Sequence, residues 1–269
     1  MKYFWLFAAL FISNFLFSQT SNLEQQLNTA RVRLPNGWHL SPAGRMLPLG
    51  DFPLNIAVSK TQRFIAVTNN GQSVQSLQLI DPKAEKILHS IIIPKSWYGL
   101  TFSEDEKFLY ASGGNDNWIL QYAIANNRLQ LKDSIKLGEK WPTKISPAGI
   151  TLDDQAGLLY VVTKENNALY VIELRTKKIV HEEKLGHEAY ACLLSKDKKE
   201  LYISSWGGDQ VIVFNTTTRS ISSKIAVGDN PNELLLNKKG NLLFVANAND
   251  NSVSVIDIKQ RKVLEVLNT

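Results

Sequence analysis

One strand pattern recurs five times along this chain of 269 residues, and it limits the fold more than any other feature of the sequence. Each copy contains a run of aliphatic and aromatic residues, then a turn rich in Gly, Asn and Asp, then a further strand-forming run. The aligned anchor residues of the copies are Ile65, Tyr110, Tyr160, Tyr202 and Phe244. The anchors lie 45, 50, 42 and 42 residues apart, which indicates repetition of one supersecondary unit.

The first strand of each copy is apolar throughout, as residues 56–58 (Ile-Ala-Val) and 234–236 (Leu-Leu-Leu) show. Runs of this kind are typical of strands that are covered on both faces. Four short strands in a repeat of about 40–45 residues are typical of one blade of a β-propeller. A β-sandwich also has many short strands, but it does not require five similar repeats. The sequence therefore predicts an all-β fold, a β-propeller of four-stranded blades with five repeats visible.

The start of the repeat region predicts how a ring would close. Residues 47–53 are similar to residues 225–231, which run from a fourth strand through a turn into the next first strand. We therefore expect residues 45–49 to form an N-terminal strand that completes the last blade. The fifth repeat already has its own candidate fourth strand at 263–267, so we expect the natural chain to continue with at least one further unit. The alternative is a five-bladed ring with a redundant N-terminal strand.

The N-terminus is typical of a secretory signal. Lys2 is followed by an apolar run at 3–16, and Ser18 is a small residue before a plausible cleavage point. The run is short for a membrane span. We predict a signal peptide at 1–18, a lead segment at 19–44 and the propeller at 45–269. The mature protein is then periplasmic or extracellular, with no membrane span after cleavage.

The sequence contains no motif for catalysis or metal binding. The four His residues do not pair with one another or with Cys at metal-ligand spacing, and neither a nucleophile elbow nor a phosphate-binding loop occurs. Cys192, the single cysteine, lies in an apolar run, which favours a small buried hydrophobe over a reactive thiol. We expect no catalytic residue, no metal and no cofactor in these 269 residues.

The strand order predicts two different faces. The turns between strands one and two and between three and four are basic with acids mixed in, and few aromatic residues lie among them. With a net charge of only +5, this pattern favours a solvated surface over a nucleic-acid site. The opposite turns and the blade-to-blade loops carry aromatic and polar residues that favour a ligand or partner face. The candidates are Trp97, Tyr98, Trp141, Lys144, His187, Tyr190, Trp206, Asp229 and Asn230.

A structural interpretation of this second face stays open. Asn, Asp and Gly in such turns are the residues that positive backbone φ angles require, and Trp side chains often wedge between blades. The 50-residue spacing adds residues around 139–147 on the same face, and Trp141 is among them. Insertions on one face of a repeat fold often carry binding.

Three stretches carry a resemblance to a known family. Residues 67–70 (Val-Thr-Asn-Asn), 159–163 (Leu-Tyr-Val-Val-Thr) and 244–257 resemble the Tyr-Val-Thr-Asn repeat of YncE-like propellers. Residues 34–38 and 40–44, together with 112–117 (Ser-Gly-Gly-Asn-Asp-Asn), resemble a narrower group in which such a propeller precedes an alkaline-phosphatase-like phosphoesterase domain. The resemblance implies a seven-bladed ring, here truncated, and a metal-dependent hydrolase domain downstream. The nucleophile and metal ligands of that domain have no counterpart in these residues.

The predicted function follows from the difference between the two faces and from the family resemblance. We expect a non-catalytic binding or scaffolding propeller that forms the N-terminal part of an exported metal-dependent phosphoesterase. Its partners would be the phosphoesterase domain of the same protein, or a small ligand or protein on the aromatic face. The alternative is a stand-alone exported propeller that binds a small ligand, a protein or single-stranded DNA. No pair of residues argues for a propeller that is itself an enzyme.

Overall fold

A computed structural model describes residues 32–33, 36–40 and 45–268. It divides into two units, residues 1–48 and 49–269. In the first unit, β1 (Val32–Arg33) pairs antiparallel with β2 (His39–Leu40). The signal peptide predicted at 1–18 and much of the predicted lead segment lie outside the described residues. Among the described residues, no helix has the length and apolar character needed to cross a membrane.

The second unit consists of five antiparallel four-stranded sheets, each built in chain order, which confirms the predicted propeller blades. Their strands are β3 (Pro53–Val58), β4 (Ile65–Asn69), β5 (Ser76–Asp81) and β6 (Lys86–Ile92) in blade 1; β7 (Leu100–Phe102), β8 (Phe108–Ser112), β9 (Trp118–Ala125) and β10 (Arg128–Lys136) in blade 2; β11 (Pro147–Asp153), β12 (Leu158–Thr163), β13 (Ala168–Glu173) and β14 (Lys178–Lys184) in blade 3; β15 (Ala189–Leu194), β16 (Glu200–Ser205), β17 (Gln210–Asn215) and β18 (Ser220–Ala226) in blade 4; and β19 (Pro231–Leu236), β20 (Leu242–Asn247), β21 (Ser252–Asp257) and β22 (Lys262–Asn268) in blade 5.

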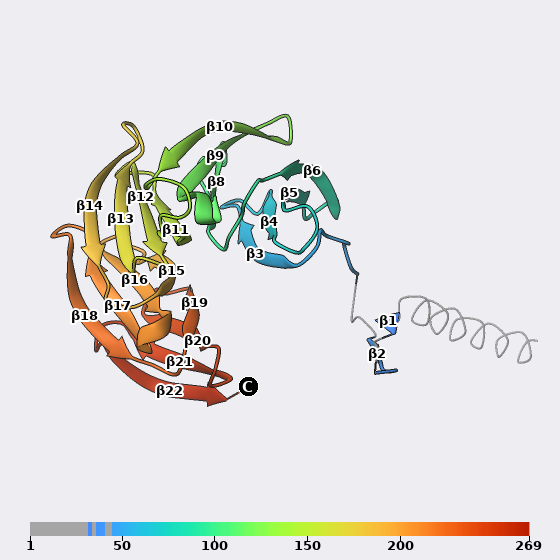
Figure 1. Cartoon of the computed structure of the whole chain (residues 1–269). Helices are drawn as coiled ribbons and strands as arrows, with labels where there is room; N and C mark the ends of the chain where they lie inside the picture. Colours follow the sequence, from blue (N-terminus) through green and yellow to red (C-terminus); the bar gives the residue numbers. More distant parts are fainter. Residues whose placement is uncertain (1–31, 34–35, 41–44, 269) are drawn as a thin grey trace, which may run out of the picture. The chain divides into compact units, whose positions relative to one another are not determined.

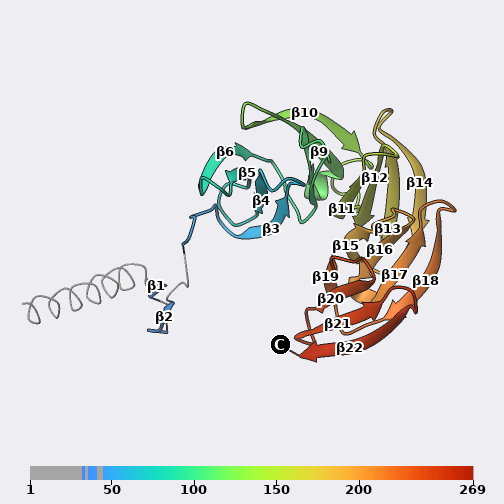
Figure 2. The same ribbon diagram turned by 180° about the vertical axis from the view of Figure 1, so that it is seen from behind.

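The blades follow one another in chain order and pack face to face (Figures 1 and 2). The innermost strands of neighbouring blades contact each other, β3 with β7, β7 with β11, β11 with β15 and β15 with β19. Between each pair of blades lies one cluster of buried apolar residues. Tyr110, Tyr160 and Tyr202, three of the predicted anchors, are buried against the blade that follows their own.

The anchor predicted for blade 1 is wrong by one residue. Phe102 pairs with Leu109 and Val58 pairs with Ile65, so Ile65 is the equivalent of Leu109. Ala66, not Ile65, therefore occupies the position of Tyr110, and the first spacing is 44 residues. The alignment failed because blade 1 has a small residue where the other blades have an aromatic ring.

The turn that leads into blade 1 confirms the predicted similarity of residues 50–53 to residues 228–231. The N–H of Asn70 donates to the carbonyl of Phe52, and the N–H of Ala248 donates in the same way to the carbonyl of Asn230. Residues 45–49 belong to no strand in the described part of the chain, where the last blade that they would complete is not present, so the N-terminal strand stays a prediction. The equivalent strand, β18, pairs with β17, whereas each of the five described sheets already has four strands of its own. The closing of a ring by these residues stays a prediction.

Close approach of the inner strands requires glycine at one position in blades 2 and 3. A Cβ atom on Gly99 would lie 2.2 Å from the carbonyl oxygen of Ala148 in the next blade. A Cβ atom on Gly149 would lie 2.7 Å from both the Cα of Ala191 and the carbonyl oxygen of Tyr190. These contacts are with backbone atoms, so a side chain there would force neighbouring blades apart.

We therefore expect Gly149→Ala to lower the free energy of unfolding by about 1–3 kcal/mol, because the methyl group overpacks the contact between blades 3 and 4. Gly207→Ala is the matched control, since a Cβ atom there would meet nothing closer than 3.9 Å, and it should change stability by less than about 0.5 kcal/mol. Urea unfolding followed by tryptophan fluorescence measures both. Equal midpoints for the two variants would contradict this packing argument.

Candidate functional site

The strand order separates the loops into two faces, as predicted. The first face holds the turns β3–β4 and β5–β6 and their equivalents in the other blades. The second face holds the turns β4–β5 and their equivalents together with the loops that join one blade to the next. Each face has a centre where several blades meet, and the two centres differ in chemistry.

Ion pairs between blades occupy the centre of the first face. The Nζ atom of Lys198, on the β15–β16 turn, lies 2.7 Å from Oε1 of Glu104 and 2.9 Å from Oδ1 of Asp153. The Nζ atom of Lys60 lies 2.8 Å from Oε2 of the same Glu104. Hydrogen bonds from Lys198 and Lys60 lower the pKa of the Glu104 carboxyl to about 2. These contacts join turns of blades 1 to 4. They also neutralise part of the positive charge of this face by pairing it with carboxylates of the protein itself.

Aromatic rings occupy the centre of the second face. Tyr98 lies in the loop before β7, Tyr190 lies on β15, and Trp206 begins the short 3-10 helix η2 (Trp206–Gly208). The ring centroids of Tyr98 and Tyr190 are 4.6 Å apart, and those of Tyr190 and Trp206 are 5.3 Å apart with the planes at 27°. We call these three side chains the aromatic cluster. It unites blades 2 and 4, and it contains three of the nine residues predicted from the sequence.

The other predicted residues have separate environments. Nδ2 of Asn230 donates to the carbonyl of Trp206 at 3.0 Å, and Oδ2 of Asp229 accepts a hydrogen bond from Asn249. Both residues therefore hold turns together, as the structural interpretation expected. Trp141 is 55% exposed, and the Nζ of Lys144 lies 5.6 Å from the centroid of its ring.

Trp97 and His187 complete the predicted set. The Nζ of Lys164 lies 5.7 Å from the ring centroid of Trp97. His187 is exposed beside Gly208, at the edge of the aromatic cluster. No ring-to-ring contact within the described residues joins Trp97, Trp141 or His187 to the cluster.

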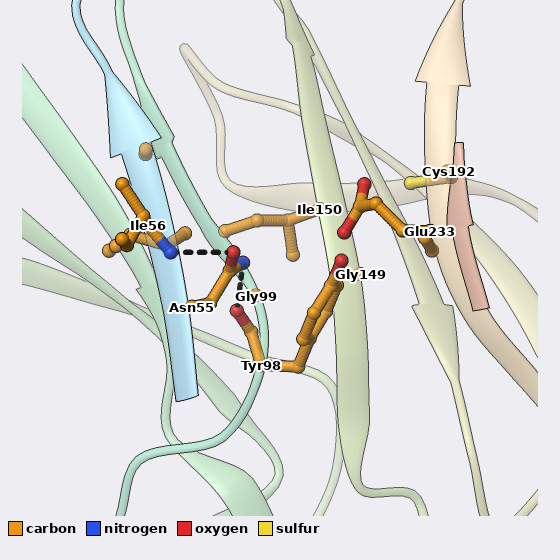
Figure 3. Close-up of a pocket in the computed structure, with 11 residues that line it drawn as sticks. Asn55, Ile56, Tyr98, Gly99, Gly149, Ile150, Cys192 and Glu233 are labelled. Atoms are coloured by element: carbon orange, nitrogen blue, oxygen red, sulfur yellow. Dashed lines mark hydrogen bonds between the residues drawn. The ribbon is translucent and has the colours of Figure 1, made fainter. Parts of the chain in front are cut away.

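A cavity of about 180 Å³ lies among the inner strands and is lined by residues of all five blades (Figure 3). Asn55, Gly99, Gly149, Ala191 and Glu233 occupy the same position of the five repeats, as the strand registers show. Nδ2 of Asn55 donates to the carbonyl of Tyr98 at 2.7 Å. Figure 3 shows the side chains of Tyr98 and Glu233 converging from different blades. Glu233 is itself exposed, and partial desolvation by the surrounding inner strands raises the pKa of its carboxyl.

A second pocket, of about 380 Å³, opens on the second face between blades 1 and 2. The β4–β5 turn, the β6–β7 loop and the 3-10 helix η1 (Gly114–Asp116) contribute to it. Its lining consists of Phe52, Leu54, Asn70, Gln75, Lys95, Ser96, Trp97, Gly114 and Asn115. The sequence analysis identified only Trp97 of this set as a candidate. Glu233 and Gln75 were missed because no local motif marks them.

The described residues contain no group of three or more His, Cys, Asp or Glu side chains arranged to hold a metal ion. Cys192 is buried between blades 3 and 4, which confirms its predicted structural role, and burial raises the pKa of its thiol to about 12.

Five face-to-face blades, each of four antiparallel strands, define a β-propeller, and the comparisons with known proteins then place it in a family. The family described as YNCE-like beta-propeller matches residues 23–269, so this chain belongs to that family. Among solved structures, the chain is similar to hydrazine synthase of Kuenenia stuttgartiensis, with a TM-score of 0.64 and 16% sequence identity. The match covers 81% of this chain and 66% of the other, less than two thirds of its length. No curated protein matches.

The ion pairs of the first face allow a direct test. We expect Lys198→Met to raise the pKa of Glu104 toward its ordinary value of 4.5, because the hydrogen bond from Lys198 is the largest cause of the depression. Since the folded-state pKa lies below that of the unfolded chain, the stabilisation is present above pH 4.5 and is lost as pH falls toward 2 in the unmutated protein. Carboxyl titration by NMR measures the shift. Lys199→Met is the control, and an unchanged Glu104 pKa in Lys198→Met would contradict the assignment.

Proposed function

We propose that this chain is a non-catalytic binding and scaffolding propeller and forms the N-terminal part of an exported, metal-dependent phosphoesterase. The observation that carries the binding role is the difference between the two faces. The first face is held by ion pairs between blades, whereas the second carries the aromatic cluster and opens into the pocket beside Trp97. Aromatic surface beside a few polar groups is the composition that ligand and partner sites share. The phosphoesterase and the export rest on resemblance and on the N-terminal sequence pattern.

Exposed apolar surface at blade 5 supports further blades. Tyr110, Tyr160 and Tyr202 are each buried by the blade that follows, but Phe244, the equivalent residue of blade 5, is only half-buried. Leu235, which pairs with Phe244, is 65% exposed. In blade 1, Ile56 is 59% and Val58 is 56% exposed. Apolar sheet faces of this kind are normally covered, so we propose that additional blades complete a seven-bladed ring.

The size of the natural protein tests this proposal. In the organism that makes it, we expect an antibody against the propeller to detect a polypeptide much longer than 269 residues in the exported fraction. Metal-dependent phosphoesterase activity should purify with it and be lost on treatment with a chelator. A polypeptide of about 269 residues without such activity would instead support the alternative, a stand-alone exported binding propeller. Steeply salt-dependent binding would then identify single-stranded DNA as its ligand.

The aromatic cluster gives a second test in the full-length protein. We expect Trp206→Ala to raise the KM for the phosphoester substrate by about tenfold, because the ring stacked on Tyr190 is removed from the binding face. Tyr190→Phe is the matched control, since it keeps the stacked ring and removes only the hydroxyl group. Steady-state kinetics measures both variants, and thermal unfolding checks that they are folded. Equal KM values in Trp206→Ala and the unmutated protein would count against a role of this face in binding.

A further inference from the structure

The pocket between blades 1 and 2 has apolar walls. Phe52 is 65% exposed at the pocket rim and adopts a positive φ of 51° directly before Pro53. Leu54 and Trp97 also line the pocket. Two aromatic rings and an aliphatic side chain around one opening are suited to a flat apolar group. The volume of about 380 Å³ lies in the range of small-molecule sites.

The polar groups of the pocket are held by hydrogen bonds that use their acceptor atoms. The N–H of Ser96 donates to Oε1 of Gln75 at 2.9 Å, and the hydroxyl of Ser96 donates to Oδ1 of Asn70. Nδ2 of Asn70 in turn donates to the carbonyl of Ser96 at 2.7 Å. The hydroxyl of Ser146 donates to Oδ1 of Asn115 at 3.1 Å. The side-chain amide oxygens of the pocket are therefore engaged by the protein itself.

What remains for a ligand is a set of donors. Within the described residues, Nε2 of Gln75 and Nδ2 of Asn115 have no protein acceptor at hydrogen-bonding distance, and the buried Nε1 of Trp97 has none either. Nζ of Lys95 donates to Oδ1 of Asp116 at 3.0 Å and keeps two further N–H groups. A cation and several N–H donors with no free amide oxygen match a ligand group that only accepts hydrogen bonds.

We infer that this pocket binds an organic anion, a carboxylate or phosphate group carried by a flat apolar ring. The ring lies against Phe52 and Trp97, and the anionic group accepts hydrogen bonds from Gln75, Asn115 and Lys95. Lys164, whose Nζ lies 5.7 Å from the ring centroid of Trp97, adds positive charge near this residue of the pocket wall. This inference rests on the proposed binding function and names the chemical class of the ligand.

Gln75→Glu is the sharpest variant, because it keeps the oxygen that accepts from Ser96, removes the Nε2 donor and adds a negative charge. Gln72→Glu is its matched control, since Gln72 is exposed on the same β4–β5 turn, does not line the pocket and adds the same charge. The probes are phenyl phosphate and phenylacetate, titrated into the whole chain by calorimetry. We expect both variants to fold, and Gln75→Glu to weaken binding about tenfold or more while Gln72→Glu changes it less than about twofold.

A second variant tests the apolar wall without disturbing the backbone. Asn230, at the start of blade 5, is the equivalent of Phe52 at the start of blade 1 and has a similar positive φ of 53°. Phe52→Asn therefore introduces a residue type that the fold already accepts at this position of the repeat. We expect Phe52→Asn to weaken phenyl phosphate about tenfold and to leave thermal stability unchanged. Inorganic phosphate and benzyl alcohol, each with one half of the predicted ligand, should bind at least about tenfold more weakly than phenyl phosphate.

The two anionic probes show whether the pocket prefers a phosphate or a carboxylate group, and tighter binding of either one supports the inference. Failure of both to bind at millimolar concentration would overturn it, as would equal binding to Gln75→Glu and the unmutated chain. Benzyl alcohol binding as tightly as the anions would also overturn it. If the anions fail while Trp206→Ala still raises KM in the full-length protein, this inference is wrong and the proposed function stands.

Discussion

Packing of one blade on the next is the constraint on which the rest of this molecule depends. A single four-stranded sheet of this sequence has apolar residues on both faces and cannot bury them by itself. Blades 2, 3 and 4 therefore each place a ring anchor, Tyr110, Tyr160 or Tyr202, against the following blade. At the inner strand the same packing requires glycine, because the backbone of one blade approaches that of the next at Gly99 and Gly149. Burial of the sheet faces and glycine at the inner strands are thus two aspects of one contact.

This division of roles leaves the loops free to differ between blades. The sheets are stabilised by their faces, so the turns at either end do not have to pack, and their chemistry varies. On the first face, Lys198 and Glu104 use opposite charges to join blades 2 and 4. On the second face, Tyr98 and Tyr190 join the same two blades through their rings. An ion pair satisfies its own polar groups, whereas a half-buried ring such as Tyr190 or Trp206 keeps part of its surface for another molecule, and for this reason the second face is the better candidate for recognition.

The sequence predicted the fold well because the repeat is local. Each blade is contiguous in the chain, and the alternation of apolar strands and turns is visible without knowledge of distant contacts. The error at Ile65 arose because Ala66 stands where the other blades have an aromatic anchor. The sequence alignment compared residue types, whereas strand register determines which positions are equivalent in the structure. The pocket between blades 1 and 2 could not be predicted in the same way. Gln75, Trp97 and Asn115 come from three separate loops, and only the packing of blade 1 on blade 2 brings them together.

The inner-strand position that holds Gly99 in blade 2 and Gly149 in blade 3 holds polar residues in the first and fifth blades. In blade 1 this position is Asn55, and its side chain donates to the backbone of Tyr98 in the following blade. In blade 5 it is Glu233, which is exposed and whose Oε1 accepts a hydrogen bond from the N–H of Leu234 at 3.2 Å. A polar side chain between two inner strands requires a hydrogen-bonding partner there. Because Asn55 obtains its partner from the next blade, the further blade proposed above would have to offer the Glu233 carboxylate a backbone N–H or a cation at the corresponding place. The exposed Leu235 and the half-buried Phe244 beside it form the apolar surface on which the same proposal rests, so one further blade would have to satisfy both the polar and the apolar groups of blade 5.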